Sequence, residues 1–449
     1  MSSPFTLVIS SIVLAIFAGS GIFLYLWRKP KKIHFLFLLI ILSILPVVSI
    51  FRPGSYESSD LSAHVTFAMS FFKALTDGSL IPRWGMDLNY TYGFPAFLFI
   101  YLLPYYFISI LHIVAIPFLL ATKLVLALSF IFSGITMYYF VKDELGELGG
   151  FISAIFYLYA PYHLVDLHFR VDIGEIVAFV FLPLLLLAIK KVALNHSVGN
   201  TLFVSLVFAA LILSHPALSI AAIPVAALYI CYLLKNNVLN RRESLSIILL
   251  ALLIGIFLTC FYWFPILTEG KFTSAYQHGY QVIFPNLMNF LVSPYYFGFL
   301  YQGHKGELSF PLGFVQIVIV LSIPFMLKRK NLLGKQRLLV FLGFLLIVLY
   351  FLLMQSIAKP LWYMIPLIKN FQFSYRLMGI IIFCVSLCAG MMLSLIKNRK
   401  LLILILTLTI LSTILNWGNR KNIPALNEHY LQSHLSESDK NFAVMGQAI

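Results

Sequence analysis

Residues 55 to 106 read SYESSDLSAHVTFAMSFFKALTDGSLIPRWGMDLNYTYGFPAFLFIYLLPYY, a stretch whose first part is polar and carries acids. Four of the 16 acidic residues of the chain lie in it: Glu57, Asp60, Asp77 and Asp87. The stretch separates apolar runs that are each about as long as the roughly 20 residues a helix needs to cross a bilayer. The sequence therefore predicts a loop between membrane-spanning helices that carries candidate functional side chains.

The rest of the chain has the composition of a membrane protein. Hydrophobic residues make up 61% and charged residues 10% of its 449 positions. A soluble enzyme of this length would carry far more surface charge, and a membrane barrel would show shorter segments of alternating polarity. We therefore expect an all-α polytopic membrane protein with about 11 to 13 transmembrane helices.

The net charge of +15 also follows a membrane pattern. Of the 31 basic residues, 17 lie in five short gaps between apolar runs, with Glu243 as the one acid among them. This positive-inside distribution predicts that the five gaps face the cytoplasm and that the loop at 52 to 93 faces outward, and it argues against nucleic-acid binding. The five groups are Arg28, Lys29, Lys31 and Lys32; Lys190 and Lys191; Lys235, Arg241 and Arg242; Lys328, Arg329, Lys330, Lys335 and Arg337; and Lys397, Arg399 and Lys400.

One part of the chain does not fit a simple alternation of sides. Between the loop at 52 to 93 and the inner pair Lys190 and Lys191 lie four apolar segments, whereas opposite sides require an odd number. One of the four is expected to be re-entrant or too short to span.

Three regions are predicted along the chain. Residues 1 to 32 form an extra N-terminal transmembrane helix with its basic inner loop, and residues 33 to 416 form the main transmembrane domain. Residues 417 to 449 form a short outer tail, too short to fold as a stable domain unaided and interpreted as a tail or a truncated C-terminal domain.

Within the first outer loop, Val65, Met69 and Phe72 recur at helical spacing and predict an amphipathic helix along the membrane surface. Asp60 and His64 lie four residues apart and would share one face of that helix. A carboxylate beside an imidazole suits proton abstraction or metal binding. The alternative is that Asp60 caps the helix, and the spacing alone leaves both open.

Two neighbouring segments resemble a known family. SDLSAHVTFAMSFFKALTDGSLIPRW, followed by YGFPAFLFIYLLPYY, resembles the signature of the membrane-integral family labelled 6-pyruvoyl-tetrahydropterin-synthase-related. In that family an Asp and a His come first, then a GxLxPRW turn, then an aromatic run. The family is similar to the GT-C glycosyltransferases, membrane enzymes that take sugar from a polyprenyl-phosphate carrier on the outer face. Their first outer loop carries an acid at the place that Asp60 holds here.

Three further segments extend the resemblance. LYAPYHLVDLHFRVDIGEIVAFVFLPLLLL resembles a signature in which an Arg and a Glu precede a span, and these are Arg170 and Glu175, although Val171 stands where the family often has glycine. FYWFPILTEGK is similar to a third signature with Glu269, and FQFSYRLMG to a fourth with Arg376. The resemblance thus covers nearly the whole chain.

The resemblance implies roles for these charged residues, which are costly at helix mouths unless paired or functional. Converging carboxylates would deprotonate an acceptor hydroxyl or hold a divalent cation, Mg or Mn, and the two arginines would bind the lipid-linked phosphate. The catalytic candidates are Asp60, as the base, and Glu175. The donor- or acceptor-binding candidates are His64, Arg83, Trp84, Arg170, Asp172, Glu269 and Arg376, and the metal candidates are Asp60, Asp172 and Glu175.

Structural alternatives remain open for several of them. Arg170 and Arg376 are also suited to anchor helix ends at lipid headgroups, and Glu175 to form an ion pair with Arg170. Trp84 fits an interfacial aromatic belt as well as a sugar-stacking surface. His215 is interpreted as a buried, hydrogen-bonded side chain rather than a ligand.

The function expected from these observations is that of an integral membrane glycosyltransferase. It would move a sugar from a polyprenyl-phosphate donor to a cell-envelope glycan, lipid or protein acceptor, with its active face outside the plasma (cytoplasmic) membrane. The alternative is a transporter or flippase of lipid-linked saccharide, which typically carries charged or broken helices near the bilayer midplane. A third is a catalytically silent scaffold. The acids map to the predicted outer mouths, which favours the transferase.

Overall fold

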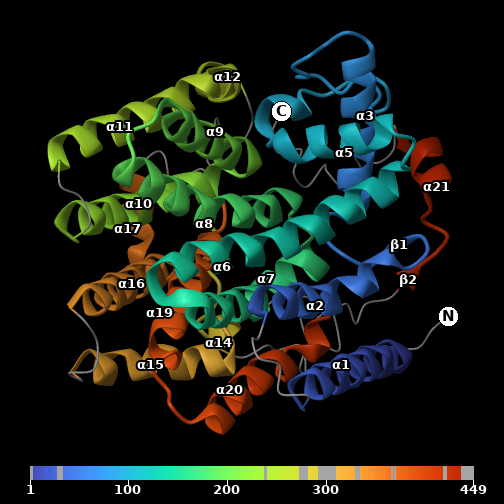
Figure 1. Ribbon diagram of the computed structural model, residues 1–449. Helices are drawn as coiled ribbons and strands as arrows, with labels where there is room; N and C mark the ends of the chain where they lie inside the picture. The colour runs from blue at the N-terminus through green and yellow to red at the C-terminus, as the bar shows by residue number, and fades with distance from the viewer. Residues whose placement is uncertain are drawn as a thin grey trace.

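The structure is a computed structural model of the 449-residue chain, and nearly all of its ordered elements are helices (Figure 1). It describes residues 4 to 27, 34 to 236, 240 to 272, 282 to 291, 310 to 328, 334 to 365, 368, 371 to 417 and 422 to 435. The longer helices are α1 Pro4–Trp27, α2 Phe35–Val47, α3 Leu61–Thr76, α6 Phe118–Leu158, α8 Ile173–Leu194, α9 Val198–Ser214, α10 Pro216–Asn236, α11 Arg241–Leu258, α15 Phe314–Lys328, α16 Gly334–Leu353, α19 Met378–Leu393 and α20 Arg399–Leu411. The shorter elements are β1 Ser55–Tyr56, α4 Ala96–Phe99, α5 Leu103–Ile113, α7 Pro161–Val165, α12 Cys260–Glu269, α14 Met288–Leu291, α17 Lys359–Met364, β2 Asn422–Ile423 and α21 Glu428–Ser433.

The long helices form a membrane bundle built around α8. This helix packs against α6, α9, α10 and α11, and α19 packs against α6 and α16. Within the described residues, five helical segments are long and apolar enough to cross a bilayer: α6, α8, α10, α16 and Ser374–Leu393. The α11 and α12 helices, bent by 64°, count as a sixth if they form one span. The predicted polytopic all-α membrane fold is confirmed. The predicted 11 to 13 spans exceed this count, which covers only the described residues, takes α6 once although it is broken at Gly146, and leaves out apolar helices of 10 to 17 residues.

The α6 helix is in fact two segments that fold back on each other. Gly146 inside it has φ 78° and ψ 179°, which is not a helical conformation. A β-carbon on Gly150 would lie 2.6 Å from the Tyr138 carbonyl oxygen, and one on Gly134 would lie 2.6 Å from the Leu158 side chain. Such close approaches place the two halves side by side in opposite directions, with glycines where the backbones meet.

The hairpin in α6 helps to explain why four apolar segments, an even number, precede Lys190. The run at 94 to 115, predicted to span, forms only α4 and α5, and the 11 residues of α5 reach about 16 Å, half of the hydrocarbon thickness. Three segments then remain: the two halves of α6, and α8. The hairpin turn meets the end of α8, where Lys190 Nζ lies 2.8 Å from Glu144 Oε1. The predicted short segment is therefore the one at 94 to 115.

The predicted helix of the first loop is present as α3. Figure 1 shows it running across the direction of the long helices rather than along them. Its first half is buried nearly all round, because α5, α6 and α21 pack against it. The amphipathic character predicted from the sequence therefore holds best for its C-terminal half.

The described part of the C-terminal tail is attached to the same loop. β2 pairs with β1 in antiparallel register, with Ser55 opposite Ile423. The Glu428 carboxylate accepts a 3.0 Å hydrogen bond from the Leu119 amide at the start of α6, where helix amides lack partners. The tail thereby fixes the entry of the chain into α6.

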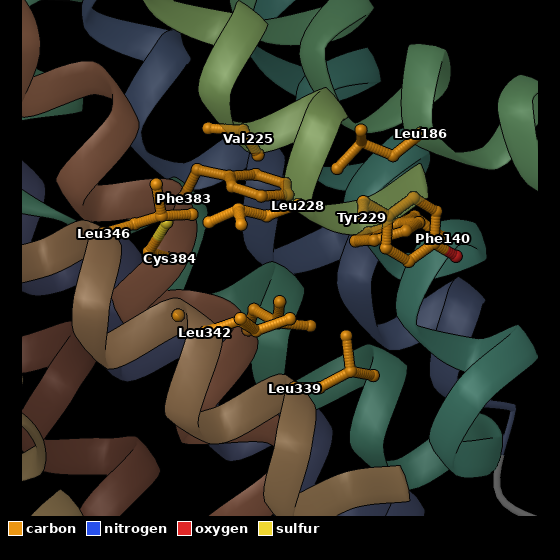
Figure 2. Close-up of a pocket in the computed structure, with 12 residues that line it drawn as sticks. Phe140, Leu186, Val225, Leu228, Tyr229, Leu339, Leu342, Leu346, Phe383 and Cys384 are labelled. Atoms are coloured by element: carbon orange, nitrogen blue, oxygen red, sulfur yellow. The ribbon is translucent and has the colours of Figure 1, made fainter. Parts of the chain in front are cut away.

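The interior of the bundle is apolar. A cavity of about 30 Å³, roughly the volume of one water molecule, lies among α6, α8, α10, α16 and α19, and Figure 2 shows the side chains around it. Cys384 lines it and Cys388 lies beside it, and both are buried. This cavity holds no charged group and is too small for a sugar or a lipid.

Candidate functional site

The charged residues of the site gather at the start of α8. The chain reaches it through one π-helical turn, Asp166–Arg170, after α7. Asp172 then caps α8 by accepting a 3.2 Å hydrogen bond from the Glu175 amide. Negative side chains are favourable at this end of a helix, because its free amides carry partial positive charge.

Val171 joins the π turn to the cap in a left-handed conformation, with φ 58° and ψ 45°. A β-branched residue rarely adopts this conformation, since its Cβ meets the following carbonyl oxygen. The Val171 amide donates a 2.8 Å hydrogen bond to the Asp166 carbonyl, and its side chain is fully buried. The geometry explains why glycine is frequent at this position in the family that the sequence resembles.

Replacing Val171 with glycine is therefore expected to cost little. The lost packing of the buried side chain is offset by relief of the left-handed strain, about 1–2 kcal/mol. Val165→Gly is the matched control, because Val165 is also buried but has an ordinary helical φ of −62°. The melting temperature of Val171→Gly should lie above that of Val165→Gly. Equal or reversed melting temperatures would show that Val171 is not strained.

Arg170 lies inside a group of three buried carboxylates, Asp166, Asp172 and Glu175, which we call the carboxylate cage. Its Nη1 is hydrogen-bonded to Asp166 Oδ1 and lies 3.0 Å from Glu175 Oε2, and its Nη2 lies 3.1 Å from Asp172 Oδ2. Only 5% of Arg170 is exposed. Both Nη atoms are thus bonded inside the protein, which argues against the predicted role of Arg170 as a phosphate ligand.

Two tyrosines complete the surroundings of Arg170. The Tyr162 hydroxyl accepts from Arg170 Nη1 at 3.1 Å and donates to Glu175 Oε1 at 2.7 Å. The ring of Tyr375 lies 5.0 Å from the guanidinium carbon, within cation–π range. Glu175 is fully buried and holds Arg170, so it positions the site rather than touching a ligand.

Asp60 reaches the cage through the backbone of the first loop. The Ser59 and Asp60 amides donate to the Phe169 and Arg170 carbonyls at 2.8 and 3.1 Å. Asp60 occupies the N-cap position of α3, but its side chain makes no capping bond, and Ser58 Oγ accepts from the Leu61 amide instead. The capping alternative is therefore not supported.

The Asp60 carboxylate is the acid left without a partner at this site. No hydrogen bond or ion pair to it occurs among the residues that the structure describes. Its burial, followed by the negative charge of Asp172, raises its pKa to about 7, against the opposing effect of Arg170 and Arg376. A half-buried carboxylate with such a pKa is suited to accept a proton near neutral pH.

His64 supports the cage from α3 and does not face the open side. Its Nδ1 lies 2.8 Å from the Tyr105 hydroxyl and its Nε2 3.4 Å from the Tyr101 hydroxyl, which donates to Asp172 Oδ1 at 3.0 Å. Burial lowers the pKa of His64 to about 4, so the ring is neutral. His64 is thus placed to position Asp172 through Tyr101, not to contact a donor or acceptor.

Arg376 is the cation that remains accessible. Its Nη1 donates to the Phe371 carbonyl at 2.9 Å, while its Nη2 is 3.9 Å from Asp172 Oδ2, longer than a hydrogen bond. Its Nε is buried without a hydrogen-bond partner in the described part of the chain, and 20% of its side chain is exposed. Nη2 is thus the donor left for an incoming anion, because Nε is shielded from solvent.

The structure does not bring the other predicted site residues into this group. Arg83 and Trp84 are exposed on the segment before α4, and Arg83 borders a shallow groove formed with Tyr262. Glu269 is exposed at the end of α12. Within the ranges that the structure covers, none of the three contacts Asp60, Arg376 or the carboxylate cage.

Several residues of the site were missed in the sequence. Asp166 is four residues before Arg170, a spacing that by itself predicts an ion pair on a helix. Tyr101 and Tyr162 carry no comparable signal, because tyrosines at span mouths usually belong to the interfacial belt. Tyr105 is also fully buried, against His64.

A divalent cation does not fit the buried part of the site. Ligand atoms of Asp172, Glu175 and His215 lie within 4.8 Å of one another, and Asp60 is not in this group. His215 Nδ1 accepts from the Leu218 amide at 3.1 Å, so its other nitrogen carries a hydrogen and faces Asp172 at 3.7 Å. Both oxygens of Asp172 and of Glu175 already accept hydrogen bonds.

The fold has counterparts among solved structures. Arabinofuranosyltransferase AftD from Mycobacteria superposes with a TM-score of 0.53 and 16% identity, over 84% of this chain and 26% of AftD. The oligosaccharyltransferase of Archaeoglobus fulgidus superposes with a TM-score of 0.50 and 12% identity, over 92% of this chain and 55% of that enzyme. Identities this low show a shared fold alone, which is that of GT-C glycosyltransferases.

The sequence is similar to one curated protein and to one family model. An uncharacterized protein of Lactococcus lactis subsp. cremoris is 25% identical over 250 residues, 54% of this chain and 41% of that protein. The chain thus spans less than half of that relative, about a quarter of AftD and just over half of the oligosaccharyltransferase. Residues 99 to 420 match the model of the 6-pyruvoyl-tetrahydropterin synthase related domain, a membrane protein family. With most of its length matched, this chain belongs to that family.

Proposed function

We propose that the protein is a membrane glycosyltransferase that uses a polyprenyl-phosphate sugar as donor, with Asp60 as its general base. The observation that carries this proposal is which charged groups at the start of α8 form hydrogen bonds or ion pairs and which do not. Asp60 and Arg376 keep free polar atoms, while every charged group of the carboxylate cage is engaged. A free base next to a free cation is what transfer from a phosphate-linked sugar requires.

The proposed reaction is a single displacement at the anomeric carbon of the sugar. The acceptor hydroxyl gives its proton to the Asp60 carboxylate while its oxygen forms the new bond to that carbon. The bond from the anomeric carbon to the phosphate oxygen breaks, and its electron pair stays on the lipid-linked phosphate. Such a displacement needs one base and no covalent intermediate, so it inverts the configuration.

Arg376 is proposed to bind the lipid-linked phosphate. Its Nη2, to which no hydrogen bond occurs among the described residues, provides a charge-assisted contact for a phosphate oxygen. As the phosphate leaves, the charge on its oxygens grows, and a cation held in place stabilises that charge more than the ground state. Acceptor identity is proposed at the level of cell-envelope glycan, lipid or protein.

The transporter alternative has less support. A flippase typically places helix breaks and charged groups near the bilayer midplane. Here the charged cluster lies at the start of α8, and the other charged pair on this helix, Lys190 with Glu144, lies at its opposite end. Between them the residues of α8 are mainly apolar, and its Leu186 lines the small cavity of Figure 2.

The test is complementation of a strain that lacks the protein, with the composition of envelope glycans read by mass spectrometry. Wild type should restore one sugar that is missing from the deletion strain, and Asp60→Asn at matched membrane expression should not. Full restoration by Asp60→Asn would remove the proposed base. Accumulation of a lipid-linked sugar on the inner face only would indicate a flippase instead.

The rate of transfer should depend on the ionisation of Asp60. A base must be deprotonated, and burial with the nearby Asp172 charge raises the pKa of Asp60 to about 7. We therefore expect kcat/KM to fall about tenfold per pH unit below pH 7 and to level off above it. The free energy of unfolding should change in the opposite direction. Asp60 binds its proton more tightly in the folded than in the unfolded state, so the folded state loses stability as the pH rises from about 4 to 7. A flat rate profile from pH 5 to 9 would exclude Asp60 as the base.

A further inference from the structure

The carboxylate cage resembles a metal site in composition but not in its bonding. Asp166, Asp172 and Glu175 bring three carboxylates to one buried place, and oxygens of this kind are what Mg²⁺ and Mn²⁺ prefer. A divalent ion there would need several free oxygens about 2.0–2.2 Å away and room for water ligands. Arg170 stands in that place instead, hydrogen-bonded to all three carboxylates.

We infer that the Arg170 guanidinium is the resident cation of this site, occupying the position among Asp166, Asp172 and Glu175 that a divalent ion would need, and that transfer requires no divalent cation at this cluster. The first half of the inference concerns the bonding alone. The second half rests on the proposed glycosyltransferase function.

The shape of the guanidinium fits this role. Its two Nη atoms diverge, so that Nη1 serves Asp166 and Glu175 while Nη2 serves Asp172. Tyr162 and Tyr375 lie within 6.0 and 5.0 Å of its central carbon and shield it from water. A planar cation with five donors can hold three carboxylates at fixed angles, which neither a lysine nor a spherical ion bound by water would reproduce.

The neighbouring residues leave no second place for an ion. The remaining free oxygen of the cage is Asp166 Oδ2, which is buried and has no hydrogen-bond partner in the described residues. His215 uses Nδ1 to cap α10 and presents an N–H to Asp172. Asp60 is not part of the cluster of Asp172, Glu175 and His215, and the carboxylate oxygens of that cluster already accept hydrogen bonds from Tyr101, Tyr162 and Arg170.

The arrangement also explains how a phosphate could approach so many acids. Three carboxylates next to the mouth of the site would repel an anionic donor. Arg170 neutralises part of that charge from inside, and Arg376 presents its own charge on the open side, 3.9 Å from Asp172. The two arginines thus have separate tasks, one internal and one toward the ligand.

The inference is tested by counting Mn²⁺ ions on the purified full chain in detergent, from the electron paramagnetic resonance signal of free Mn²⁺. Wild type, Asp172→Asn and Glu175→Gln should bind the same number of ions, since only scattered surface acids take part. Loss of one ion in either variant relative to wild type would overturn the inference. Two variants are compared because Asp172→Asn also removes the negative charge from a helix cap.

A second measurement uses Arg170→Met, which empties the centre of the cage. If this variant folds, Mn²⁺ should raise its melting temperature and leave that of wild type unchanged; stabilisation of wild type by the same amount would overturn the inference. If the variant does not fold, the ion count on wild type and Asp172→Asn still decides.

Transfer assays separate the inference from the proposed function. Transfer that continues after treatment with EDTA supports both, and transfer that is lost with EDTA and restored by Mn²⁺ overturns the inference while keeping the function. Absence of transfer under every condition would contradict the proposed function, and the ion count would then stand by itself as the test of the bonding.

Discussion

Asp60→Asn is expected to lower the transfer rate by about 10²–10⁴-fold, the usual contribution of a general base. The amide keeps the shape of the side chain but cannot accept the proton of the acceptor hydroxyl. Folding should be unaffected or slightly improved, because the carboxylate has no partner to lose in the described structure and its burial next to Asp172 is unfavourable. The rate is measured with membranes at matched expression, and folding by the melting temperature.

The matched control for this substitution is Asp77→Asn. Asp77 lies at the other end of α3 and is exposed, so the same chemical change there should leave both rate and melting temperature as in wild type. A large loss of activity in both variants would point to α3 as a whole rather than to Asp60. Retention of more than a tenth of the rate by Asp60→Asn would show that another group takes the proton.

Arg170→Met is expected to give the largest loss of stability of any single substitution at the site, about 3–5 kcal/mol. It removes the shared cation and leaves Asp166, Asp172 and Glu175 buried without compensation. Arg170→Lys should recover only part of the loss, because one ammonium cannot reach all three carboxylates at the angles that the guanidinium provides. Stability is measured as the temperature at which half of the detergent-solubilised protein still elutes as a monodisperse peak.

Arg83→Met serves as the control for Arg170→Met. Arg83 is exposed and no ion pair to it occurs within the described residues, so its removal should shift the melting temperature by little. If Arg170→Met were as stable as Arg83→Met, the cage would have to be held by protonated carboxylates rather than by the guanidinium.

Much of the architecture could be predicted from the sequence because the bilayer restricts what a chain can do. Long apolar runs have to become helices, since backbone groups find no partner in hydrocarbon. Charged residues at helix mouths are costly, and this is why Asp60, Arg170 and Arg376 stood out. The failure of the run at 94 to 115 to span was foreseen only as a problem of parity. Hydropathy could not show which run fails to span. This run is apolar throughout, but its helix is broken between α4 and α5.

The roles inside the site could not be predicted in the same way. In the sequence Asp60 was the candidate base and Glu175 a second catalytic candidate, and Arg170 and Arg376 were both candidate phosphate ligands. The structure separates the members of each pair by their partners. Glu175 and Arg170 bond to each other and are buried, whereas Asp60 and Arg376 keep free atoms.

The sequence by itself determined that this is a polytopic helical membrane protein whose few acids and arginines gather at the ends of spans. Hydropathy and the free-energy cost of placing a charge in the bilayer both depend on local composition. Only the tertiary structure decided which of these charged residues form ion pairs with one another. That outcome depends on the loop at Asp60, the turn at Arg170 and the segment at Arg376 meeting in space, and on which of their atoms remain exposed. Pairing of charges is a long-range property, and no local pattern encodes it.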